Sequence, residues 1–195
     1  MMMFSMEVET VTQRKSVDGY FSELLGMDLA RIHPGEIVTV RSIRRESPGD
    51  ESSAGRTTTP VWILVAGGRG AVSSSRFLFR VVEAWAQDFA APEYLLLPKF
   101  LDDLQAAVSR ALDSPAAVVR SRLFAAVKGG SGGKRVVSFN LPLAEGKSPE
   151  RALAESDPDR IVLFLCSDSD HASAHAALAT GCIEYGRSVK FVVRR

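Results

Sequence analysis

Cysteine is scarce in this sequence, long apolar runs are missing, and the net charge is close to zero. The two cysteines, Cys166 and Cys182, are too few for a disulfide framework, and both stand in apolar stretches. We therefore expect buried free thiols in a reducing compartment. No apolar run approaches the roughly 20 residues of a membrane span, and the apolar residues 1–6 lack the basic region of a signal peptide. These absences favour a cytoplasmic protein without a membrane partner.

The charge balance and the length limit the class of protein further. Lys and Arg number 24, Asp and Glu number 23, and the net charge is +1. This balance argues against a strongly basic nucleic-acid-binding protein, although it permits a local basic patch. The 195 residues suit one domain or slightly more, and the 46% hydrophobic and 24% charged residues are typical of a globular protein.

The order of apolar runs and turn residues predicts an α/β (α+β) fold. We expect a mixed, largely antiparallel sheet, two main flanking helices and a C-terminal β-α-β unit. The expected organisation is a disordered arm at 1–15, an α/β domain at 16–145 with a flexible loop at 46–60, a linker at 146–159, and a closing unit at 160–195 packed on the same sheet.

The spacing of apolar and turn residues also predicts individual elements. Helices are expected at 18–25 with Gly26 as the stop, at 77–85 with Ser73–Ser75 as the cap, at 100–112, and at 149–154 with Ser148 as the cap. Strands are expected at 37–40, 61–65, 123–127 and 135–141, with a tight turn at Gly67–Gly70 and either a strand or a helix lead-in at 94–97. The glycine-rich residues 129–133 predict that the last two strands form an antiparallel hairpin.

The terminal stretch has the clearest pattern. Residues 160–166 form an apolar run of strand length, and a polar turn over 167–170 follows. The alanine-rich residues 171–180 predict a helix that Gly181 ends, and residues 188–193 predict a second strand. Together these signals predict the β-α-β unit.

This terminal unit resembles the closing segment of the acetyl-CoA-dependent N-acyltransferases of the GNAT superfamily. In that family a strand ends in Asn, a small residue follows three positions later, and Gly-Phe stands eleven and twelve positions after the Asn. Asp170, Ser173 and Gly181 occupy the matching positions in this sequence. Cys182 replaces the Phe, and Ala177 stands where the family often has a tyrosine as general acid.

The resemblance implies a reaction and a set of site residues. An active member lets a substrate amine attack the thioester of bound acetyl-CoA, with Tyr185 and Asp170 as catalytic candidates and Asp170 and Ser173 as cofactor-binding candidates. The pyrophosphate-binding turn of the family, Arg/Gln-x-x-Gly-x-Gly/Ala, is missing, and residues 146–158 stand in its place. The expectation is an acyl-CoA-dependent N-acyltransferase or a degenerate, non-catalytic relative, and a homodimer remains open.

Two other constellations near this unit have a chemical and a structural interpretation. His171 and His175 have a spacing that can hold a divalent metal, with Asp168 and Asp170 just before them. No third ligand is anchored elsewhere, and acidic residues at a helix start also follow from capping, so no metal is expected. Cys166 could pair with His171 as nucleophile and base, whereas a thiol inside an apolar run is typical of a core residue.

Two alternatives from other classes remain. The order of elements over 61–143 resembles the Alba-like nucleic-acid-binding fold, whose phosphate-facing surface would comprise Arg69, Arg76, Lys99, Arg120, Arg122, Lys128, Lys134 and Arg135. A structural or interaction subunit without a small-molecule site would instead use Trp62, Phe77 or Trp85 in a partner interface.

Overall fold

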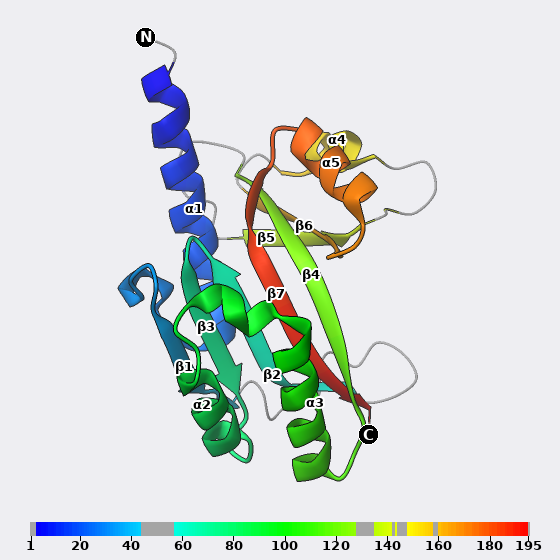
Figure 1. Ribbon diagram of the computed structural model, residues 1–195. Helices are drawn as coiled ribbons and strands as arrows, with labels where there is room; N and C mark the ends of the chain where they lie inside the picture. Colours follow the sequence, from blue (N-terminus) through cyan, green and yellow to red (C-terminus); the bar gives the residue numbers. More distant parts are fainter. Residues whose placement is uncertain are drawn as a thin grey trace. The chain divides into compact units, whose positions relative to one another are not determined.

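The computed structural model describes residues 3–43, 57–127, 135–141, 143, 148–157 and 160–194 (Figure 1). In this part of the chain seven strands form one mixed sheet in the order β1-β3-β2-β7-β4-β6-β5, which confirms the predicted α/β class. The strands are β1 (Ile37–Arg41), β2 (Thr57–Ala66), β3 (Arg69–Ser74), β4 (Ala116–Val127), β5 (Arg135–Asn140), β6 (Arg160–Ser167) and β7 (Ile183–Arg194). The helices are α1 (Met3–Leu25), α2 (Phe79–Gln87), α3 (Pro98–Leu112), α4 (Pro149–Glu155) and α5 (His171–Ala179), with short 3-10 helices η1 (Leu29–Arg31) and η3 (Pro92–Leu96).

The chain divides into two compact units. Residues 1–21 and 121–187 form the first unit, and residues 22–120 and 188–195 form the second. The divisions fall inside α1, β4 and β7, so each of these elements supplies residues to both units. The expected linker at 146–159 lies within the first unit, where α4 buries Ala152 to 4% exposure. The short helix α4 begins as predicted, because the Ser148 side chain accepts a hydrogen bond from the Arg151 backbone N–H.

The core of the second unit is built on β2. Val61, Ile63 and Val65 alternate along this strand and belong to one apolar cluster with residues of α2, α3 and β7. The intervening Trp62 and Leu64 are buried as well. Since successive side chains point to opposite faces of a sheet, β2 is buried on both faces, as its continuous apolar run predicts.

A two-residue turn at Gly67 and Gly68 joins β2 to β3. Their φ angles are 57° and 71°, which glycine adopts without steric strain, so the predicted tight turn is confirmed. The predicted helix cap at Ser73–Ser75 is wrong, because β3 ends at Ser74 and α2 begins only at Phe79. All three serines are buried, and the Ser73 hydroxyl donates to the Leu25 carbonyl oxygen at 2.8 Å. Pairing within the sheet therefore outweighs the preference of serine for helix starts.

Two other predicted irregular segments differ from the structure. α1 begins at Met3, so the described part of the expected arm at 1–15 is helical, and the helix ends as predicted before Gly26, whose φ is 78°. Residues 57–60 of the expected loop are the first part of β2, and residues 44–56 lie outside the described residues. Residues 94–97 lead into α3 through η3.

The most apolar strand of the first unit, β6, lies between β4 and β5. It pairs antiparallel with β4 and parallel with β5. The predicted hairpin of residues 123–127 with 135–141 is therefore wrong, because β6 separates the two strands in the sheet. The physical reason is burial: Ile161–Phe164 are buried without interruption, whereas exposed Ser138 and Asn140 alternate with half-buried residues along β5.

Helices α4 and α5 lie side by side in the first unit (Figure 1). Residues of both helices share an apolar cluster with Phe124 of β4 and with Val162, Phe164 and Cys166 of β6. These two helices therefore cover one face of the first unit's strands, which we call the α5 face. The elements β6, α5 and β7 follow one another as predicted, with β4 between β6 and β7 in the sheet. Among the described residues, no helix is long and apolar enough to cross a membrane.

Candidate functional site

Two of the predicted site residues meet at the start of α5. Asp170 is the N-cap residue, and its Oδ1 accepts a hydrogen bond from the Ser173 backbone N–H at 3.0 Å. Hydrogen bonds from the Ser173 side chain and backbone hold the pKa of the Asp170 carboxyl below its usual range. The carboxylate satisfies one of the free N–H groups of the first helical turn. Its observed role is to hold the start of α5 in place.

An ion pair on the α5 face joins β4 to β7. Arg122 Nε and Nη2 donate to the two carboxylate oxygens of Glu184 at 3.1 and 2.8 Å. Phe124 lies two positions after Arg122 on β4, so its side chain points to the same face of the sheet. It packs in the cluster that contains α5. The hydrogen bond from Arg122 holds the pKa of Glu184 below its usual range. Cys166 stands opposite Arg122 in the sheet register, and burial raises the pKa of its thiol.

Tyr185 lies on the other face of the same strand. Because side chains alternate along a strand, Tyr185 points away from the face that Glu184 shares with α5. It is 2% exposed, and its hydroxyl donates to Asp18 Oδ1 at 2.6 Å. Its ring stacks on Phe21 of α1, with ring centroids 5.2 Å apart and planes 11° from parallel. The sheet therefore separates Tyr185 from Asp170, and the two catalytic candidates do not share a site.

The other chemical groups of the terminal unit are dispersed. His171 and His175 are exposed on α5, and Asp168 forms an ion pair with Arg187 at 3.8 Å. Among the described residues, no group of three or more His, Cys, Asp and Glu side chains could hold a metal ion. Both cysteines are buried and free, which confirms the expected state of the thiols.

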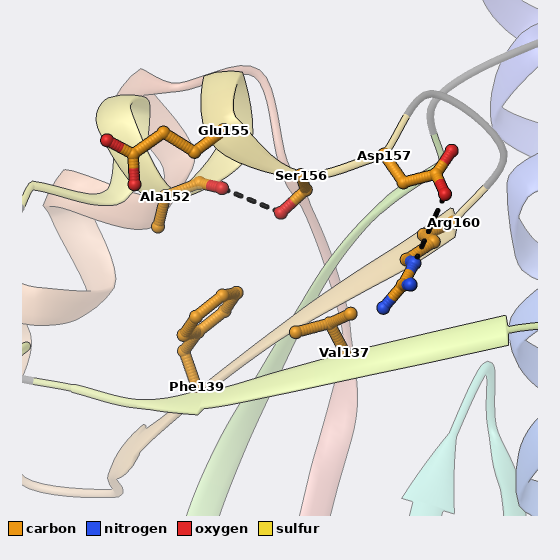
Figure 2. A pocket seen from close by; sticks show the side chains of 7 residues that line it. All are labelled: Val137, Phe139, Ala152, Glu155, Ser156, Asp157 and Arg160. Atoms are coloured by element: carbon orange, nitrogen blue, oxygen red, sulfur yellow. Dashed lines mark hydrogen bonds and ion pairs between the residues drawn. The ribbon is translucent and has the colours of Figure 1, made fainter.

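A pocket of about 380 Å³ lies between β5 and α4 on the α5 face. Figure 2 shows Val137 and Phe139 on β5, Ala152 and Ser156 on the opposite side, and Arg160 at the start of β6. The Phe139 ring stacks on Phe164 with centroids 5.6 Å apart, which fixes the apolar side of the pocket. The Ser156 hydroxyl donates to the Ala152 carbonyl oxygen at 2.7 Å. Small-molecule sites commonly have volumes of about 300–1,000 Å³, so this pocket has a suitable size.

Arg160 is the polar centre of the pocket. Its Nε lies 3.6 Å from Asp157 Oδ2, beyond hydrogen-bond length. That Nε is buried and has no hydrogen-bond partner within the described part of the chain. The second carboxylate of the lining, Glu155, accepts from Arg151 Nε at 2.6 Å and is turned away from Arg160 in Figure 2. Among the described residues, the Arg160 Nε therefore has an ion-pair neighbour in Asp157 and no hydrogen-bond acceptor.

The sequence contains two signals for this pocket. Arg160 is a charged residue placed directly before a buried apolar run, and Val137 and Phe139 alternate with polar residues on β5. These patterns predict strands with one apolar face each. They do not predict that β5 and β6 are neighbours, and that pairing brings Arg160 beside Val137 and Phe139.

Two of the basic residues of the nucleic-acid alternative are engaged within the protein. The Arg69 guanidinium donates to two backbone carbonyl groups at 3.0 and 3.3 Å, and Arg122 is paired with a carboxylate. Lys128 and Lys134 lie outside the described residues. The hairpin that would grip a duplex is not formed, so nucleic-acid binding stays a prediction without its main structural argument.

The aromatic residues of the interaction alternative differ in accessibility. Phe77 is 70% exposed, with the Arg76 guanidinium carbon 4.6 Å from its ring centre. Trp62 is only 7% exposed, and half-buried Trp85 donates from Nε1 to the Phe100 carbonyl oxygen at 3.2 Å. Of the three, Phe77 is the most exposed.

Comparisons of the chain with protein-family models, with curated proteins and with solved structures find no match. Two features of the structure bear on function: the order of elements around α4 and α5, and the state of the residues that acyl transfer would need.

Proposed function

We propose that this chain is a GNAT-like protein that binds an acyl-CoA thioester through its first unit and does not transfer the acyl group. The observation that carries this proposal is the arrangement β5-α4-β6-α5-β7. β5 and β6 are parallel neighbours joined by α4, and Asp170, which matches the family's Asn, is the N-cap of α5. The resemblance implies the same parts for this half of the protein: a strand, a helix, a parallel strand, a capped helix and a last strand.

We infer that acyl transfer does not occur, because this reaction requires a proton donor near the thioester. When an amine displaces CoA, the leaving thiolate needs a general acid close by. The Asp170 pKa lies below its usual range, so this carboxyl is ionised near neutral pH and cannot donate a proton. Tyr185 is buried on the opposite face of the sheet with its hydroxyl bound to Asp18. Neither candidate can serve a thioester on the α5 face.

Thermal unfolding and a thiol-release assay test the two halves of the proposal. A ligand that binds only the folded protein raises the unfolding midpoint, so acetyl-CoA and CoA should both raise it. Release of CoA from acetyl-CoA, followed with a thiol reagent and a panel of primary amines, should stay at the uncatalysed rate. A rate enhancement that depends on the protein would contradict the non-catalytic half. No midpoint shift at millimolar acetyl-CoA would contradict binding.

A salt-dependent control separates this proposal from its rival. A DNA or RNA duplex is titrated in parallel at two salt concentrations. Binding through phosphate contacts weakens steeply as salt rises. A midpoint shift with duplex but not with acetyl-CoA would replace the proposal with nucleic-acid binding.

A further inference from the structure

We propose that the pocket beside α4 is a binding site for a small organic acid with one carboxylate and an apolar body. The Arg160 guanidinium receives the carboxylate, and the side chains of Val137 and Phe139 contact the apolar body. This inference goes beyond the proposed function, because it stands on the pocket itself. The pocket lies around the C-terminal end of α4, whereas the family's pyrophosphate turn precedes the corresponding helix.

The Arg160 guanidinium is suited to bind a carboxylate. A guanidinium offers several N–H donors in a planar fork that matches the two oxygens of a carboxylate. Arg160 Nε is buried without a hydrogen-bond partner among the described residues, and Figure 2 shows the guanidinium directed into the pocket. A buried donor without an acceptor is unfavourable, and among the described residues Nε has only the 3.6 Å ion pair with Asp157, so an oxyanion in the pocket would add hydrogen bonds to the guanidinium.

The remaining lining limits the charge of the ligand. Asp157 Oδ2 lies 3.6 Å from Arg160 Nε and offsets part of its charge, which disfavours a dianion such as phosphate. A cationic ligand would face the guanidinium, since Arg160 is the only cation among the described lining residues. Glu155, which could have attracted a cation, is already paired with Arg151 at 2.6 Å. Because Asp157 offsets much of the Arg160 charge, a ligand with at most one negative charge fits this lining.

The apolar part of the ligand is defined by β5. Val137 and Phe139 point into the pocket from the same face of the strand, and Ala152 lies across from them. The stack of Phe139 on Phe164 keeps the ring in place. An aliphatic or aromatic group of a few carbons would therefore be removed from water while its carboxylate reaches Arg160.

Isothermal titration with 3-phenylpropionate, 3-phenylpropionamide and 3-phenylpropylamine tests the proposal. The three probes share their apolar body and differ in charge. The acid should bind at one saturable site, and the amide and the amine should bind at least about tenfold more weakly. Acetate, butyrate and benzoate extend the series in size. If none of the acids binds below about 10 mM, or if the amide binds as well as the acid, the proposal is overturned.

Variants locate the site. Arg160→Gln should weaken binding of the acid at least about tenfold. Arg160→Lys keeps the charge but loses the planar fork of donors, so its affinity for the acid should lie between those of the parent and of Arg160→Gln. Arg80→Gln is the matched control, because Arg80 is an arginine of α2 with a 90% exposed side chain outside the pocket lining. It should bind the acid as the parent does. Unchanged affinity in both Arg160 variants would overturn the assignment. Because acetyl-CoA is measured separately, each proposal can fail alone.

Discussion

Replacing Tyr185 with Phe tests whether this residue is structural. The change removes the hydroxyl that donates to Asp18 at 2.6 Å and keeps the ring that stacks on Phe21. No cavity larger than one oxygen atom results, so the cost is close to that of the lost hydrogen bond. With a carboxylate as acceptor and a residue only 2% exposed, we expect a loss of about 1–3 kcal/mol in the free energy of unfolding. For a chain of this size that is roughly 2–4 °C of melting temperature for each kcal/mol.

The assay can follow the unit that contains Tyr185. Both cysteines, Cys166 and Cys182, fall in the first unit, whereas both tryptophans, Trp62 and Trp85, fall in the second. Thiol labelling during a urea titration therefore reports unfolding of the first unit, and tryptophan fluorescence reports the second. Tyr185→Phe should lower the urea midpoint for thiol exposure by the amount worked out above.

Two comparisons make this prediction refutable. Tyr94→Phe is the control, because Tyr94 is 47% exposed, and its midpoint should match the parent. The double variant with Asp18→Ala should show a coupling energy of about 1–3 kcal/mol. An unchanged thiol-exposure midpoint in Tyr185→Phe would refute the structural role. A general acid, by contrast, would lose activity on this change without losing stability.

Three further predictions concern the α5 face. Glu184→Gln breaks the ion pair with Arg122 and should cost about 1–3 kcal/mol near neutral pH. Since that pair lowers the folded pKa of Glu184, its contribution is complete above the unfolded pKa of about 4.3 and is lost as the pH falls through the folded pKa, so the parent and the variant should converge in acid unfolding curves. Asp170→Ala should lower the melting temperature, because the helix cap is lost. Asp170→Asn can still accept a hydrogen bond from Ser173 and should lower it less, so equal losses in the two variants would contradict the capping role. The Cys182 side chain is 4% exposed, and burial raises the pKa of its thiol. This thiol should therefore react with an aromatic disulfide only on unfolding, and fast labelling of the native protein would contradict its burial.

Local patterns predicted much of the secondary structure. The apolar run of β2, the helical spacing of α3 and the serine cap of α4 depend on neighbouring residues, and each is present as expected. The strand β3 was missed because Arg69–Ser74 contains few apolar residues. Its serines are buried by pairing with β2 on one side and β1 on the other, which no short window of sequence contains.

Contacts between distant residues limited the prediction of the site. The capping role of Asp170 needs only the next three residues and was visible in the sequence. The partner of Tyr185 is Asp18, 167 residues earlier in the chain, so its burial could not be inferred locally. The position of β6 between β4 and β5 is also non-local, and it decides that Arg160 and Phe139 line the same pocket.

The most direct test of the proposed function is hydrogen–deuterium exchange with and without acetyl-CoA. Exchange reports local opening along the backbone, so a bound ligand slows it where it contacts the protein. We predict slower exchange in peptides that cover β5, α4 and β6, with no acetyl transfer to added amines in the same samples. Protection confined to the second unit, or no protection at saturating acetyl-CoA, would contradict the account.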